Sequence, residues 1–208
     1  HPESMHFAKR CYWMGDGERP IYTKEKDDTL AALASLAGEH PAETWLRITH
    51  ESDGTANFHQ PFFNRDFEAV GKLMKRDWVV PGLGDAGAHV SMIMDSGWPS
   101  FYLSHWVRET EQITLEHAIH SMTQRAAEVL DLNDRGVLNV GKRADVNIID
   151  LGSIAERQPE VVTDFPHEKS RLIQRGSGYK NTIVNGQIIL ENDELTGNRN
   201  GRILRSTD

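Results

Sequence analysis

Residues 81–89 read Pro-Gly-Leu-Gly-Asp-Ala-Gly-Ala-His and directly follow the apolar run Trp78-Val79-Val80. This pattern places the carboxylate of Asp85 where a buried strand ends, and residues at the C-terminal ends of strands form the active-site mouth of a (β/α)8 barrel. The small residues on both sides of Asp85 allow backbone or substrate to come close. Asp85 is therefore a candidate catalytic or metal-bound acid. The alternative is a tight turn in which its carboxylate bonds its own backbone.

The sequence around this stretch predicts a βαβ unit. Residues 56–63 have a strand pattern that leads into Asn64, and a helix over 67–76 and a strand over 77–83 follow. A strand, a helix of about ten residues and a second strand are typical of a right-handed crossover between parallel strands. The chain is therefore predicted to contain α/β structure with Asn64 and Asp85 at neighbouring strand ends.

Helix signals extend on both sides of this unit. Asp27 and Asp28 are predicted to cap a helix over 30–37 that ends at Gly38, and Pro41 is predicted to lie in the first turn of a second helix. Apolar spacing predicts further helices over 99–109, 114–122 and 125–130. The first 26 residues show no clear period and are predicted to be irregular.

The residue pattern changes after residue 135, where glycines separate short runs rich in β-forming residues. Residues 144–151 and 182–190 are predicted strands, and Asn185-Gly186 splits the second one in the way that a type I′ hairpin requires. We therefore predict a domain boundary near Leu132, with an α/β part over residues 1–132 and a small, mostly-β module over residues 133–208.

Composition limits the class of function. The chain has 208 residues and a formal net charge of −8, which argues against nucleic acid or an anionic membrane as partner and favours a small-molecule role. The single cysteine, Cys11, excludes an internal disulfide framework and a Cys-rich zinc module, and we expect a cytoplasmic location. A complete (β/α)8 barrel needs about 250 residues, so part of the barrel is expected to be missing.

Several motifs occur in an order that resembles the C-terminal part of the amidohydrolase superfamily, in particular its N-acyl-D-amino-acid deacylase (D-aminoacylase) branch. The match extends over roughly residues 28–205. Its parts are Phe62-Phe63-Asn64, the stretch 82–89, Trp106-Val107-Arg108-Glu109, Met122-Thr123, Asp134-Arg135-Gly136, Gly141-Lys142-Arg143-Ala144-Asp145, Val184-Asn185-Gly186 and Leu195-Thr196-Gly197.

The resemblance implies a TIM-like barrel, of which this chain supplies strands seven and eight, followed by a small β-sandwich module. Asp85 is then the aspartate that ends barrel strand eight. The family's His-x-His pair and the ligands from its middle strands have no match here. His117 and His120 are three residues apart, a spacing that can bind a metal but that also suits the face of an amphipathic helix.

The implied reaction is hydrolysis of a linear amide, a C–N bond other than a peptide bond, in an N-acyl-D-amino acid. Zinc in the full-length enzyme would activate water, and Asp85 would bind or adjoin the metal and act as general base and then acid. Asn64 is a candidate substrate contact or a helix-entry turn residue. His89 either contacts the leaving group or caps the loop. We expect this chain alone to hold no zinc stably and to be inactive.

Two other functions stay open at this point. The chain as given could be a non-catalytic fragment or interaction module, in keeping with its missing ligands, or it could belong to a cyclic-amide hydrolase of the dihydroorotase or hydantoinase kind. Exposed strand edges at the ends of a partial barrel also predict self-association, so a homo-oligomer is expected.

Overall fold

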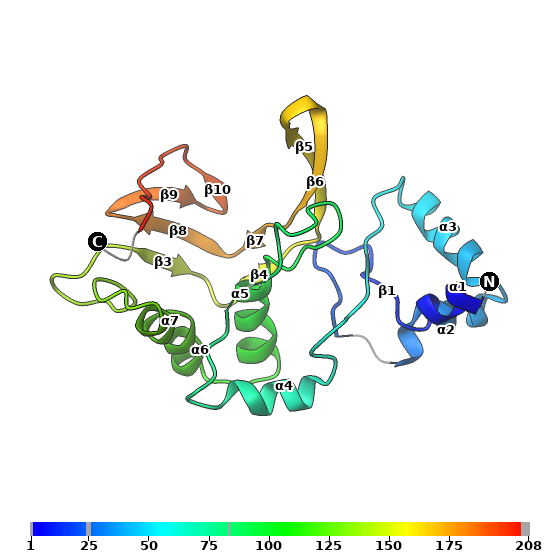
Figure 1. Ribbon diagram of the computed structural model, residues 1–208, viewed down its shortest axis with the longest axis horizontal. Helices are drawn as coiled ribbons and strands as arrows, with labels where there is room; N and C mark the ends of the chain where they lie inside the picture. Colours follow the sequence, from blue (N-terminus) through cyan, green and yellow to red (C-terminus); the bar gives the residue numbers. More distant parts are fainter. Residues whose placement is uncertain (1, 24–25, 83, 205–208) are drawn as a thin grey trace. The chain divides into compact units, whose positions relative to one another are not determined.

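The computed structural model describes residues 2–23, 26–82 and 84–204 and contains both helices and strands (Figure 1). The chain divides into two compact units. The first comprises residues up to Phe67 together with Gly87–Met94 and Arg157–Arg175, and the second comprises Glu68–Ala86, Asp95–Glu156 and the chain from Gly176 onward. The domain boundary near Leu132 stays a prediction.

The helices of the first unit are set by local capping signals. α2 (Leu30–Ala37) begins after Thr29, whose hydroxyl accepts the Ala32 amide, and ends at Gly38 with a φ of 68°. α3 (Pro41–Glu51) opens with a capping box between His40 and Glu43. These two helices confirm the sequence prediction, except that Thr29 rather than the Asp pair caps α2. The pair lies in the short η1 (Lys26–Asp28).

The prediction that the first 26 residues are irregular holds for residues 14–23 but is wrong for two stretches before them. α1 (Pro2–Ala8) is a helix and β1 (Tyr12–Trp13) is a short strand. Ala8, Cys11 and Leu30 are buried together, with Phe58 packed against them. This small cluster explains why the segment is structured, because its apolar side chains pack against residues far along the chain. The local spacing of apolar residues in the sequence does not indicate such contacts.

Strands in the first unit are short. β1 pairs antiparallel with β2 (Phe58–His59), so only two residues of the predicted strand 56–63 form one. β5 (Glu160–Phe165) and β6 (Lys169–Ile173) form an antiparallel hairpin through η3 (Pro166–Glu168). The amide of Leu172 in β6 donates to the carbonyl of Val90, which ties the segment 87–94 to this hairpin.

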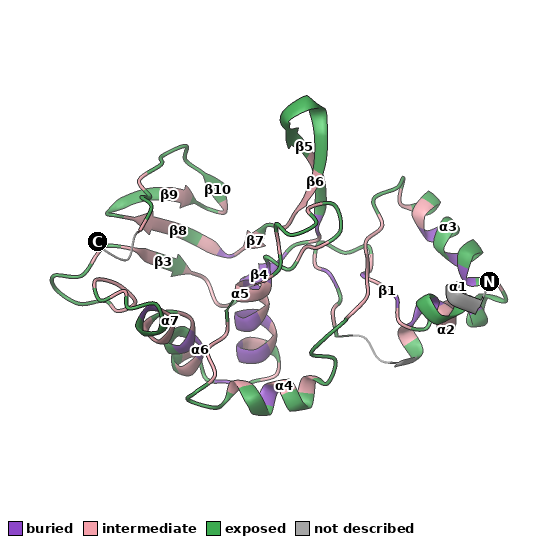
Figure 2. Ribbon diagram, in the orientation of Figure 1, coloured by how far each residue is buried: buried purple, intermediate pink, exposed green. Residues whose placement is uncertain are grey.

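The second unit holds the helices that follow Phe67. They are α4 (Phe67–Met74), α5 (Trp98–Phe101), the π-helix η2 (Tyr102–Glu109), α6 (Leu115–Met122) and α7 (Gln124–Val129). The buried side chains of this unit gather on η2 and α6, among them Tyr102, Trp106 and the fully buried Ala118 (Figure 2). The predicted helix 99–109 therefore forms, but most of it has π-helical hydrogen bonding.

The strands of the second unit form an antiparallel sheet in the order β10-β9-β8-β3. Its members are β3 (Val146–Ile149), β8 (Tyr179–Val184), β9 (Gln187–Glu191) and β10 (Glu194–Leu195). Asn185 and Gly186 connect β8 to β9 with φ values of 51° and 79°, which confirms the predicted type I′ turn. β4 (Ala155–Glu156) pairs with β7 (Gly176–Ser177) separately.

The predicted strand 77–83 is not formed over residues 77–82, and Leu83 lies outside the described residues. Among the described residues every strand pairing is antiparallel, so the predicted parallel βαβ unit is absent there. Parallel strands are stable when both faces are covered and both edges are paired. Trp78, at the start of this apolar run, is instead 73% exposed. None of the helices in the described ranges has the length and apolar character needed to cross a membrane.

Candidate functional site

Asp85 lies in the second unit, in the loop between α4 and α5, and its side chain is exposed. Its backbone amide donates a hydrogen bond of 2.8 Å to Oδ2 of Asp95. Within the described part of the chain the Asp85 carboxylate itself makes no hydrogen bond or ion pair. The alternative of a turn in which Asp85 bonds its own backbone is therefore not what the structure contains.

Gly84 makes this arrangement possible. A Cβ at residue 84 would lie 2.9 Å from both the carbonyl oxygen and Oδ1 of Asp95, closer than real side chains approach. The sequence predicted a close approach of backbone in this loop, and Gly84 is the residue that provides it. Gly82 and Gly87 differ, since a Cβ there would meet no described atom within 4 Å.

His89 belongs to the first unit and adopts a left-handed backbone conformation, with a φ of 48°. Its carbonyl accepts the amides of Met92 at 2.7 Å and Ile93 at 3.1 Å, so its backbone stabilises a turn. The side chain is exposed. This geometry favours the interpretation of His89 as a loop-capping residue, and a contact with the leaving group stays a prediction.

Asn64 also lies in the first unit, exposed and with a φ of 53°. Asparagine tolerates this left-handed conformation better than most residues, so the position suits a turn before α4. A joint site formed by Asn64, His89 and Asp85, which belong to different units, stays a prediction.

The two histidines of α6 have different surroundings. His117 is half-buried and its Nε2 lies 2.9 Å from the carbonyl oxygen of Met74, which links α6 to the end of α4. His120 is exposed. This contact supports a structural role for His117. Among the described residues, no three His, Cys, Asp or Glu side chains come together in a way that could hold a metal ion.

Arg108 in η2 forms an ion pair of 3.0 Å with Glu109, the next residue of its helix. The structure adds a second role that sequence spacing did not reveal. Nη1 of Arg108 donates to three backbone carbonyls, those of Leu151 at 3.1 Å, Gly152 at 3.2 Å and Ile154 at 2.6 Å. Arg108 therefore holds the turn between β3 and β4 against η2.

Just after this turn, the side chain of Glu156 is almost fully buried at 1% exposure. Its Oε2 accepts a hydrogen bond of 3.0 Å from the Ser104 hydroxyl in η2. A buried carboxylate needs such partners because desolvation penalises the charge. The Ser104–Glu156 contact thus joins η2 to β4.

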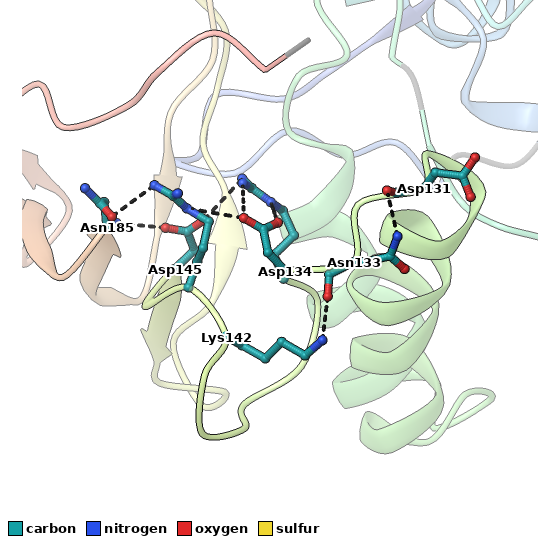
Figure 3. Close-up of polar contacts among 8 residues, drawn as sticks. Asp131, Asn133, Asp134, Lys142, Asp145 and Asn185 are labelled. Carbon is teal, nitrogen blue, oxygen red and sulfur yellow. Dashed lines mark hydrogen bonds and ion pairs between the residues drawn. The ribbon is translucent and has the colours of Figure 1, made fainter. Parts of the chain in front are cut away.

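The motifs after residue 132 form an ion-pair cluster (Figure 3). Arg135 binds Asp134 through Nε at 2.9 Å and reaches Asp145 through Nη1 at 3.3 Å. The hydrogen bond from Arg135 is the main cause that lowers the pKa of Asp134. Lys142 donates to the carbonyl of Asn133 in the same loop.

This cluster also holds the β8–β9 turn. Oδ1 of Asp145 accepts the Asn185 amide at 2.7 Å, and Arg143 donates to Oδ1 of Asn185 at 2.9 Å. Two separate motifs of the sequence, Gly141–Asp145 and Val184–Gly186, therefore meet in space. The residues of both motifs serve the fold of the second unit, because they join the loop that leads from α7 into β3 to the β8–β9 turn.

The Amidohydrolase family matches this chain over residues 6–190. An N-acyl-D-glutamate deacylase from Alcaligenes xylosoxydans xylosoxydans is 37% identical over 150 residues, which cover 69% of this chain and 28% of that protein. An N-acyl-D-aspartate deacylase from the same organism is 34% identical over 113 residues, covering 53% of this chain and 21% of that protein. The chain thus spans less than a third of the length of these relatives.

Solved structures of D-aminoacylase resemble the fold. A D-aminoacylase mutant in complex with copper chloride has a TM-score of 0.53 at 21% identity, and covers 94% of this chain and 37% of that one. A second D-aminoacylase structure, described as defining a novel subset of amidohydrolases, has a TM-score of 0.52 at 20% identity and covers 91% and 36%.

Proposed function

Because this chain belongs to the amidohydrolase family, we propose that it forms part of an enzyme that hydrolyses C–N bonds other than peptide bonds. The proposed substrate class is an N-acyl-D-amino acid. The observation that carries this proposal is the similarity, over 69% of the chain, to a protein named N-acyl-D-glutamate deacylase. The N-acyl-D-aspartate deacylase supports the same substrate class.

The proposed architecture is the C-terminal part of a TIM-like barrel followed by a small β module. The likeness to two D-aminoacylase structures supports a shared fold. The order along the chain supports this proposal, because α1 to α7 precede residue 132 and the sheet β10-β9-β8-β3 begins at Val146, although the β5–β6 hairpin belongs to the first unit.

Asp85 is the proposed general base and acid. Its carboxylate would take a proton from the attacking water while the water oxygen bonds to the acyl carbon. The same carboxyl group would then give this proton to the amine nitrogen as the C–N bond breaks, so that a carboxylic acid and a free amino acid leave. The exposed side chain and the fixed backbone amide of Asp85 support this role.

Zinc dependence is part of the proposal through the family resemblance. A catalytic zinc needs about three protein ligands, and the described residues bring no such group together. The described residues of this chain therefore do not form a zinc site by themselves.

The test is the Asp85→Asn variant of the full-length protein, assayed with N-acetyl-D-glutamate, N-acetyl-D-aspartate, N-acetyl-D-leucine and the L-enantiomer of the first. We expect hydrolysis of D-substrates and a loss of kcat in the variant of about 10²- to 10⁴-fold, because asparagine keeps the shape but cannot carry the proton. Asp77→Asn is the matched control, since Asp77 is also an exposed aspartate of the second unit.

Three outcomes would contradict the proposal. Turnover near the wild-type value in Asp85→Asn would remove Asp85 from the reaction. Ring opening of dihydroorotate or a hydantoin, without hydrolysis of linear N-acyl-D-amino acids, would place the enzyme among cyclic-amide hydrolases. No turnover of either substrate class by the metal-supplemented full-length protein would favour a non-catalytic role.

A further inference from the structure

We propose that Asp95 is a positioning residue for Asp85, acting on the backbone of the loop that carries it. This inference rests on the proposed function, in which Asp85 transfers the proton. Asp95 accepts a hydrogen bond from the Asp85 amide, and this bond does not involve the Asp85 carboxylate, which is the proposed proton-transfer group.

The first observation is the hydrogen bond of 2.8 Å from the Asp85 amide to Oδ2 of Asp95. A carboxylate acceptor makes this bond stronger than one between neutral groups. Asp85 and Asp95 are ten residues apart, so the bond closes the loop between them at the residue where the chemistry is proposed. A bond to the amide fixes the Cα of Asp85 without occupying its side chain.

The second observation is the close approach at Gly84. The carbonyl oxygen and the carboxylate of Asp95 both lie 2.9 Å from where a Cβ of residue 84 would be. A backbone oxygen and a side-chain oxygen of Asp95 therefore occupy the space that a side chain at residue 84 would need. This approach needs glycine, and it involves the Asp95 carbonyl oxygen as well as the carboxylate that accepts the Asp85 amide.

The third observation is that Asp95 is attached to a fixed part of the second unit. Its carbonyl accepts the amide of Trp98, the first residue of α5, at 3.3 Å. Ser100 in α5 is buried, and its hydroxyl lies 2.9 Å from the hydroxyl of Tyr179. The Tyr179 amide in turn donates to Oδ1 of Asp193 at 2.7 Å. Through these hydrogen bonds, Asp95 connects the Asp85 loop to α5, and α5 is in turn connected to β8.

Kinetics of three variants of the full-length protein test the role in catalysis. Asp95→Ala removes the acceptor, and we expect kcat to fall by about 10- to 100-fold with KM changed by less than about twofold, because a displaced catalytic group slows the chemical step. Asp95→Asn keeps an oxygen that accepts the Asp85 amide, so it should retain most of the activity. Gly84→Ala should lose activity as Asp95→Ala does, because its Cβ would displace Asp95.

Hydrogen exchange of the Asp85 amide gives a readout that does not depend on activity. We expect exchange to be faster in Asp95→Ala than in the wild type and near the wild-type rate in Asp95→Asn. Asp77→Ala, a change at another exposed aspartate of this unit, should alter neither exchange at Asp85 nor kcat.

The two readouts separate the inference from the proposed function. Unchanged exchange at Asp85 in Asp95→Ala would overturn the positioning role even if the enzyme hydrolyses N-acyl-D-amino acids. Equal loss of kcat in Asp95→Asn and Asp95→Ala would also overturn it. If the wild type hydrolyses no such substrate, the proposed function fails, and the exchange data alone decide whether Asp95 fixes the loop.

Discussion

Replacing Gly178 with alanine should destabilise the second unit strongly. Gly178 lies between β7 and β8 with a φ of 86°, a conformation that L side chains rarely adopt. A Cβ there would lie 2.6 Å from the backbone nitrogen and Cα of Ile154, a residue that is fully buried. Because both close atoms belong to the backbone, no change of rotamer can relieve the contact.

The expected magnitude has two parts. The left-handed conformation costs an alanine about 1–2 kcal/mol, and overpacking against a fixed neighbour adds about 1–3 kcal/mol. Gly186→Ala is the matched control, because Gly186 has a φ of 79° but a Cβ there would meet no described atom within 4 Å. Only the first cost applies to it. The two variants should therefore differ in free energy of unfolding by about 1–3 kcal/mol.

Urea and thermal unfolding followed by far-UV circular dichroism measure this difference. For a chain of this size, each kcal/mol lowers Tm by about 2–4 °C, so Gly178→Ala should melt several degrees below Gly186→Ala. The m-value should be the same in both, because the surface exposed on unfolding does not change. If Gly178→Ala is no less stable than Gly186→Ala, the backbone contact at Ile154 does not constrain this crossing, and the packing argument is refuted.

Three further expectations concern metal, association and pH. After dialysis, metal analysis should find well below one zinc per 208-residue chain, since the described residues bring no three ligands together. One tightly held zinc per chain would contradict this expectation, and His117 and His120 would then be the first candidate ligands. Light scattering coupled to size-exclusion chromatography at micromolar concentration should detect a dimer or larger species, because the apolar side chains of Val140 and Phe63 are 100% and 85% exposed. A strictly monomeric species that unfolds in one sharp transition would contradict this expectation. Burial raises the pKa of Cys11 from 9.0 to about 11, so iodoacetamide at pH 8 should alkylate it only on unfolding. The stability that the neutral thiol contributes is complete below pH 9 and decreases as the pH rises towards 11, which unfolding curves at pH 8 and pH 10 would measure.

Local signals predicted most helices and one turn correctly. α2 ends at Gly38, α3 begins at Pro41, and α6 begins after Thr114, whose hydroxyl accepts the His117 amide. Asn185-Gly186 forms the expected hairpin. In each case the deciding hydrogen bond or backbone angle involves residues only a few positions apart, so the sequence contains the whole interaction.

The predicted strand 77–83 shows where this reasoning ends. An apolar run predicts burial, but a strand exists only where another strand supplies its hydrogen bonds. Within the described residues no neighbour pairs with 77–82, and Trp78 is exposed. The π-helical form of η2 had no sequence signal either, since the same apolar spacing suits an α-helix.

The sequence by itself determined the family resemblance, the choice of Asp85 and the capped helices, because these depend on residue types and short spacings. Only the tertiary structure decided what surrounds Asp85. The contact with Asp95 spans ten residues, and Arg108 reaches carbonyls 43 to 46 residues away. Such contacts depend on how distant segments pack, because a hydrogen bond forms only when folding has brought donor and acceptor within about 3 Å of each other.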